Sequence, residues 1–213
     1  MIKRSYREPI SGLTHLFAAI VSIFGTLWLV SLTWGRPAAA LVVTIFGLGL
    51  LAIYASSSAM HFSPKTSDLR RRLRRYDHAA IYIGIAGSYT PFIYFLLDGF
   101  GQVAMFALLW TLAFVGVVGK LWYFWSGHRS TLMYLAMGWV GILVAPQVIA
   151  AAEPLVSLYV IAGGLVYTAG AAVYALRWPD LHHHFGHHEV WHLFVMGGST
   201  FHFFAVLETI SVT

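Results

Sequence analysis

The chain has 213 residues, of which 59% are hydrophobic and 10% are charged, with a formal net charge of +5 and no cysteine. Soluble domains carry about 25% charged residues, so this composition excludes a soluble enzyme, a disordered protein and a free nucleic-acid-binding protein. The lack of cysteine excludes disulfide scaffolds, thiolate metal sites and cysteine nucleophiles. We therefore expect an integral membrane protein whose excess positive charge faces the anionic cytoplasmic leaflet.

Seven apolar stretches follow one another along the chain, each long enough to cross a hydrocarbon core as a helix. The first runs from Leu13 to Thr33, which is too long for the apolar region of a signal peptide. Breaks fall at turn sequences such as Gly35-Arg36-Pro37 and Glu153-Pro154. The sequence predicts a single all-α domain, a seven-transmembrane helix bundle with spans at approximately 13–33, 38–62, 77–97, 102–124, 131–152, 155–177 and 190–211.

Lysine and arginine are distributed unequally between the two ends of these spans. Of the 13 basic residues, only Arg36 lies at the end opposite the N-terminus. The loop between the second and third spans holds the largest group: Lys65, Arg70, Arg71, Arg72, Arg74 and Arg75. Because basic loops are retained in the cytoplasm, we predict a cytoplasmic N-terminus and an external C-terminus.

Ionisable side chains in or beside membrane spans are costly and therefore suggest function. Ser57 and His61 are four residues apart near the cytoplasmic end of the second span, and Asp77 opens the third span at the same depth. His188 and His192, also four apart, begin the seventh. Residues four apart share one helix face, so three helices bring two histidine sites and an acid to one level.

Three imidazoles with an open coordination position are typical of a catalytic zinc site. An alternative is that His188-Glu189-Val190-Trp191-His192 is a metallopeptidase HExxH motif with Glu189 as the general base. The one downstream ligand available to that motif is His202, which lies about 21 Å from His188 along a helix axis. The sequence therefore disfavours a peptidase.

Structural roles compete with each of these assignments. The neighbouring histidines are interpreted as a solvated loop: His182, His183, His184 and His187. Asp77 could instead pair with Arg74 or Arg75, and a helical serine such as Ser57 often bonds only the backbone one turn back.

Several motifs together resemble those of the hemolysin III proteins, the bacterial branch of the progestin and adipoQ receptor family, which is related to alkaline ceramidases. The matching segments are Ser57-x3-His61, Arg74-Arg75-Tyr76-Asp77-His78, Gly186 to His192, Ser199-x2-His202-Phe203, and the opening Glu8-Pro9-Ile10-Ser11-Gly12-Leu13-Thr14-His15. They occur in order and span nearly the whole chain.

The resemblance implies a multi-pass protein of the bacterial inner membrane, with zinc held by His61, His188 and His192. It also implies that Asp77 lies near the zinc-bound water and that Ser57 lines the site. It assigns no clear chemistry to Glu8 or His15.

Two functions remain open from the sequence. The first is a zinc-dependent hydrolase of a lipid amide such as ceramide, acting in membrane lipid homeostasis. In it Asp77 takes a proton from water and Ser57 donates a hydrogen bond to the developing oxyanion. The second is a non-enzymatic sensor of the membrane state, in which zinc only staples three helices. A hemolysin-like cytolytic activity has less support, because no secreted soluble form is evident. The expected partners are membrane lipids and zinc.

Overall fold

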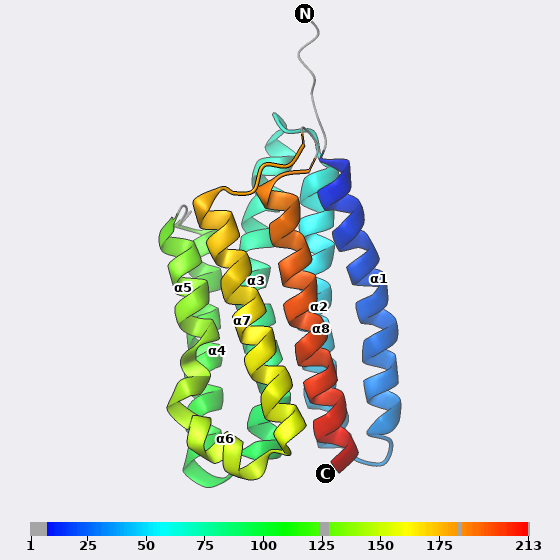
Figure 1. The fold of residues 1–213 in the computed structure, drawn as a ribbon, viewed down its shortest axis with the longest axis vertical. Helices are drawn as coiled ribbons and strands as arrows, with labels where there is room; N and C mark the ends of the chain where they lie inside the picture. The colour runs from blue at the N-terminus through cyan, green and yellow to red at the C-terminus, as the bar shows by residue number, and fades with distance from the viewer. Residues whose placement is uncertain (1–7, 124–127, 183–184, 213) are drawn as a thin grey trace, which may run out of the picture.

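The computed structural model describes residues 8–123, 128–182 and 185–212, and the regular secondary structure of this part of the chain is helical apart from one isolated bridge (Figure 1). The helices run alternately up and down the bundle. In order they are α1 (Pro9–Leu32), α2 (Pro37–Phe62), α3 (Asp68–Leu96), α4 (Gly99–Leu121), α5 (His128–Gly138), the 3₁₀ segment η1 (Val140–Val144), α6 (Ala145–Ala151), α7 (Pro154–Leu176) and α8 (His187–Val212).

Seven helical stretches within the described residues are long and apolar enough to cross a membrane, with α5, η1 and α6 together forming the fifth, Ser130–Ala151. The expectation of an all-α polytopic protein with seven spans is confirmed. Four of the helices, α1, α2, α6 and α7, begin with proline in their first turn. Proline is tolerated there because that backbone N–H has no partner within the helix.

The third helix begins at Asp68 instead of near residue 77, so the basic stretch before the span is helical. Ser67 caps it, since the Ser67 hydroxyl accepts a hydrogen bond of 3.1 Å from the backbone N–H of Arg70. Asp77 consequently lies inside α3, two turns beyond the helix start, and its side chain faces the bundle.

Helices α2 and α3 form the most extensive pair in the bundle, and glycine allows their close approach. A Cβ atom on Gly84 would lie 2.1 Å from Ile53 of α2, and one on Gly49 would lie 3.2 Å from the Cα of Gly84. Small residues let helix backbones come this near in a membrane, where packing and not water exclusion drives association. The pairing fixes Ser57 and His61 of α2 against Asp77 of α3.

The fifth span is not the continuous helix that the sequence suggests. Its backbone tightens into η1 between Gly138 and Ala145, and Pro146 follows in the first turn of α6. Tyr89 of α3 compensates for the break: its hydroxyl donates to the carbonyl of Gly138 and accepts from the backbone N–H of Gly141 at 3.0 Å. Irregular backbone at membrane depth requires such internal partners.

The outer surface of the bundle is apolar. Large exposed side chains include Phe17, Phe24, Trp28, Phe114 and Leu165. A surface of this kind suits contact with acyl chains, in agreement with the membrane-spanning length of the helices.

Candidate metal centre

The three histidines singled out in the sequence meet where α2 ends and α8 begins. Figure 1 shows this end of the bundle at the top, where α1 and α8 start. His61 comes from the last turn of α2, while His188 and His192 come from the first turns of α8. His61 and His192 are only 1% and 2% exposed. Their ring centroids form a nearly equal-sided triangle, with separations of 5.0 Å for His61–His188, 4.9 Å for His61–His192 and 4.8 Å for His188–His192.

The donor set fits a single metal ion. One ring nitrogen from each histidine lies within 4.8 Å of the other two, and the Nε2 atoms of His61 and His188 face each other at 3.3 Å. Two nitrogens on a tetrahedral zinc, each bonded at 2.0–2.1 Å, are about 3.3 to 3.4 Å apart. The buried Nδ1 of His192 has no hydrogen-bond partner within the described part of the chain. Three imidazoles of this kind could hold zinc and leave one coordination position open.

Asp77 and Ser57 lie beside this cluster, as their depth in the sequence suggests. The side chain of Asp77 is 13% exposed, and its carboxyl group is within hydrogen-bonding reach of the Ser57 hydroxyl. The adjacent His78 is close to this carboxyl group, with Nε2 4.0 Å from Asp77 Oδ2. Although Asp77 follows an arginine run in the sequence, its side chain points toward α2, because it lies on the face of α3 that is turned into the bundle.

Glu8, which had no assigned chemistry, contacts a member of the cluster directly. Its Oε2 accepts a hydrogen bond of 2.8 Å from His61 Nδ1 and another from Arg70, and its Oε1 lies 2.9 Å from Lys65 Nζ. Burial alone would raise the pKa of Glu8, but the hydrogen bonds from His61, Lys65 and Arg70 outweigh it and hold the pKa of this carboxyl well below its usual range. Glu8 is therefore a carboxylate placed behind a candidate metal ligand.

His15 is a second residue whose place the sequence did not reveal. It is 3% exposed and its ring stacks on that of His192, with centroids 3.7 Å apart and planes 14° from parallel. The signal for both residues was present in the sequence: Glu8, Ser11 and His15 are three and four positions apart, which is the spacing of one helix face.

Glu189 is turned away from the role that a metallopeptidase would require. Its Oε1 accepts a hydrogen bond of 2.7 Å from Ser11, and its Oε2 accepts one of 2.9 Å from the backbone N–H of Gly186. His202 lies far along α8, with Nε2 3.4 Å from the carbonyl of Val160. Neither residue joins the histidine triad.

The neighbouring histidines divide into separate cases. His182 is exposed and its backbone pairs with that of Phe185, as suits a loop. His187 instead begins α8 and lines the central cavity, contrary to its assignment to the loop. His183 and His184 lie outside the described residues.

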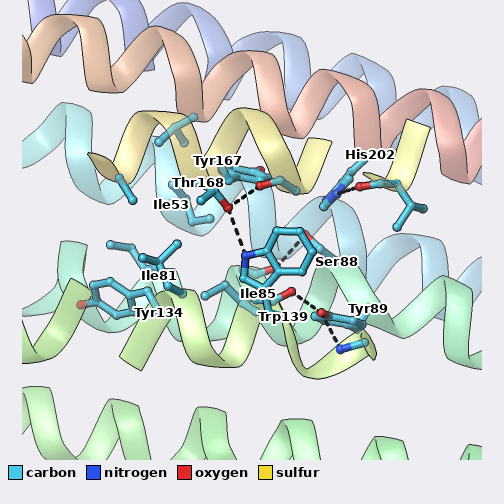
Figure 2. A pocket seen from close by; sticks show the side chains of 18 of the residues that line it. Ile53, Ile81, Ile85, Ser88, Tyr89, Tyr134, Trp139, Tyr167, Thr168 and His202 are labelled. Carbon is cyan, nitrogen blue, oxygen red and sulfur yellow. Dashed lines mark hydrogen bonds between the residues drawn. The ribbon is translucent and has the colours of Figure 1, made fainter. Parts of the chain in front are cut away.

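A cavity of about 730 Å³ connects the cluster with the interior of the bundle. His61, His188, His192, Asp77 and Ser57 all line it, and so do apolar side chains deeper in the bundle, among them Ile53, Ile85, Ile142 and Ile149. Figure 2 shows its deeper part, where Trp139 Nε1 donates to Thr168 Oγ1 at 3.0 Å and His202 reaches in from α8. The cavity therefore has a polar end at the cluster and a largely apolar length.

Comparison with known proteins assigns the chain to a family. The family model described as haemolysin-III related matches residues 4–203. The chain belongs to the haemolysin III family. It is 33% identical over 205 residues to the hemolysin-3 homolog of Bacillus subtilis (strain 168), covering 94% of this chain and 92% of that protein. It is 34% identical over 212 residues to hemolysin-3 of Bacillus cereus, covering 94% and 90% respectively.

The family assignment confirms the resemblance drawn from the motifs. The matched region of this haemolysin III protein begins before Glu8 and ends after His202, so it contains the histidine triad, Asp77 and Ser57. The family assignment and the seven candidate spans together identify the chain as a multi-pass membrane protein.

Proposed function

We propose that this haemolysin III protein is a zinc-dependent hydrolase that cleaves an amide bond of a membrane lipid, of the kind found in ceramide. The observation that carries the proposal is the shared cavity, in which the histidine triad, an acid and a hydroxyl stand at one end of an apolar chamber inside the bundle. A zinc ion that merely stapled helices would need the three histidines but neither Asp77 nor a chamber.

His61, His188 and His192 would hold the ion. Bound to three neutral imidazoles, zinc supplies a Lewis acid that polarises a carbonyl group and lowers the pKa of water to about 7.

Asp77 is the residue assigned to proton transfer. Its carboxylate accepts a proton from the attacking water and then delivers it to the departing amine, so the amide C–N bond is replaced by a C–O bond and the products are a fatty acid and an amine. Ser57 lies close enough to that carboxyl group to interact with it in the resting site. When Asp77 is protonated, the Ser57 hydroxyl is free to donate to the oxygen of the substrate carbonyl.

The cavity selects the substrate class. Its apolar length would surround an acyl chain and exclude water from it, while the polar end would receive the amide. Apart from Arg36, the basic residues of the described chain, including Lys65, Arg70, Lys120 and Arg177, lie at the same end of the bundle as the cluster. By the positive-inside rule this end faces the cytoplasm of a bacterium and the protein sits in its inner membrane.

The test is release of fatty acid from a short-chain ceramide by the purified protein in lipid vesicles, measured by mass spectrometry. We expect release by the wild type that stops when a chelator removes the metal and returns when zinc is restored. A panel of other amide and ester lipids defines the substrate. If no lipid gives chelator-sensitive release while the protein still binds zinc through the triad, the hydrolase is ruled out and the structural zinc of a membrane sensor replaces it.

A further inference from the structure

We infer that one face of α1 positions all three histidines of the triad without contributing a ligand. This group, here called the α1 face, consists of Glu8, the residue directly before the helix, and of Ser11 and His15 in its first two turns. Each of the three touches a different part of the site: Glu8 contacts His61, Ser11 contacts the residue next to His188, and His15 contacts His192. The inference rests on the proposed metal site but not on the proposed hydrolysis.

Glu8 sets the protonation pattern of His61. A carboxylate can only accept a hydrogen bond, so the 2.8 Å contact places the imidazole proton on Nδ1 of His61. The lone pair is then on Nε2, the atom that faces His188 Nε2 at 3.3 Å. A carboxylate behind a histidine in this way orients the ring and raises its basicity toward a metal.

Glu8 is itself held by Lys65, in the loop that follows α2, and by Arg70, in the first turn of α3. Arg70 donates to Glu8 and also to the carbonyls of Met60 at 3.2 Å and Ser63 at 3.1 Å. Those carbonyls belong to the end of α2 on which His61 stands. The backbone N–H of Glu8 donates to the carbonyl of His61 at 3.1 Å. The start of α1 is therefore bonded to both the side chain and the backbone of His61 at the end of α2.

Ser11 acts on the first turn of α8. Its hydroxyl donates to Glu189 Oε1 at 2.7 Å, while Glu189 Oε2 accepts from the backbone N–H of Gly186 at 2.9 Å. Glu189 thereby closes the N-terminal turn of α8, where an acid is favoured by the unpaired N–H groups. Because His188 directly precedes Glu189, anchoring that turn fixes the backbone position from which the His188 side chain extends.

His15 supports His192 by its ring alone. The two rings stack at 3.7 Å, and neither buried nitrogen of His15 has a hydrogen-bond partner in the described residues. His15 also meets the ring of Tyr54 edge-on at 5.1 Å, and the Tyr54 hydroxyl is hydrogen-bonded to Ser199 of α8. His15 therefore fills the space between α2 and α8 with a flat surface against which His192 lies.

The test measures zinc affinity of the full-length protein in detergent, by competition with a chelator of known affinity. Glu8→Gln should weaken binding by about 10- to 100-fold, as loss of a carboxylate behind a ligand does. Asp68→Asn is the matched control, because it removes an exposed carboxylate at the same end of the bundle, and within the described residues that carboxylate forms an ion pair with Arg71 alone. Ser11→Ala should weaken binding too, against Thr14→Ala as its control.

His15 separates positioning from ligation. His15→Ala should weaken zinc binding, and His15→Phe should restore it, because phenylalanine keeps the stacked ring and has no nitrogen. Cobalt bound in place of zinc should show the wild-type visible spectrum in His15→Phe and an altered one in Glu8→Gln, a change that a loss of stability alone would not produce. If Glu8→Gln does not fold, the two His15 variants carry the test.

Three results would overturn the inference. Wild-type affinity in both Glu8→Gln and His15→Ala would show that the α1 face is passive. Loss of metal from His15→Phe as complete as from His61→Ala would make His15 a ligand. Retention of zinc by His61→Ala would remove the metal site itself and the proposed function with it. The first result, found together with loss of zinc from His61→Ala, would leave the site intact and refute only the α1 face.

Discussion

The hydroxyl of Ser11 in α1 donates a hydrogen bond of 2.7 Å to the carboxylate of Glu189 in α8, although the two residues stand 178 positions apart. The contact joins the two ends of the chain beside the candidate metal centre. It also occupies the glutamate of the HExxH pattern, because the other carboxylate oxygen is taken by the N–H of Gly186.

Glu189 should therefore tolerate a neutral replacement. We expect Glu189→Gln to keep its carbonyl oxygen as one acceptor and to reduce fatty-acid release less than tenfold, with zinc retained. Removal of a general base would cost about 10²- to 10⁴-fold. A loss in that range, measured on ceramide in vesicles, would restore Glu189 as the base.

The metal should depend on the triad and not on the histidine-rich loop. His61→Ala, His188→Ala and His192→Ala should each abolish the binding of about one zinc per chain, since three neutral imidazoles suit that ion. His182→Ala should leave it unchanged, because His182 lies exposed in the loop. Elemental analysis of the purified proteins decides, and a zinc-free His182→Ala protein beside a loaded His61→Ala protein would contradict the site.

Asp77 and Ser57 distinguish the hydrolase from the sensor, because both functions need the histidines. Asp77→Asn keeps the shape of the side chain but cannot accept a proton, so release should fall by about 10²- to 10⁴-fold while zinc stays bound. Ser57→Ala should cost up to a comparable factor. Asp68→Asn serves as the control for loss of a carboxylate. Equal turnover in Asp77→Asn and the wild type would exclude Asp77 as the base.

Filling the cavity should change the preferred chain length. Gly164 lines the cavity, and a Cβ atom there would meet nothing nearer than Trp139 at 3.9 Å. The larger side chain of Gly164→Leu should therefore occupy space meant for the acyl chain. We expect hydrolysis of long-chain ceramide to fall about tenfold or more relative to a short-chain one, as for a methylene clash in an apolar pocket. An unchanged ratio of the two rates would mean that the chain lies elsewhere.

The orientation can be tested with a phosphatase that works only outside the cytoplasm. Fused after Thr213 it should be active, and fused after Ser67 it should be inactive, because nearly all basic residues lie at the end of the bundle that holds Ser67. The opposite pattern would place the cluster on the external side.

The class of protein and the depth of the site in the membrane follow from the amino-acid pattern alone. Runs of about 20 apolar residues must become helices in a membrane, because each backbone N–H and C=O needs a partner within its own segment. The spacing of four between Ser57 and His61, and between His188 and His192, then fixed which faces carry the polar groups. The break at η1 and the helical start of α3 were not visible in this way, since one depends on Tyr89 from another helix and the other on a cap at Ser67.

The contacts that support the site depend instead on how the helices pack. The depth of a residue along a span can be counted from the sequence. The rotation of one helix relative to its neighbour is set by packing, as the close approach at Gly49 and Gly84 does for α2 and α3. The contacts of Glu8 with His61 and of His15 with His192 join residues from opposite ends of the chain or from different helices. No local pattern encodes such pairs, because hydrogen bonds and ring stacking form only after the helices have packed.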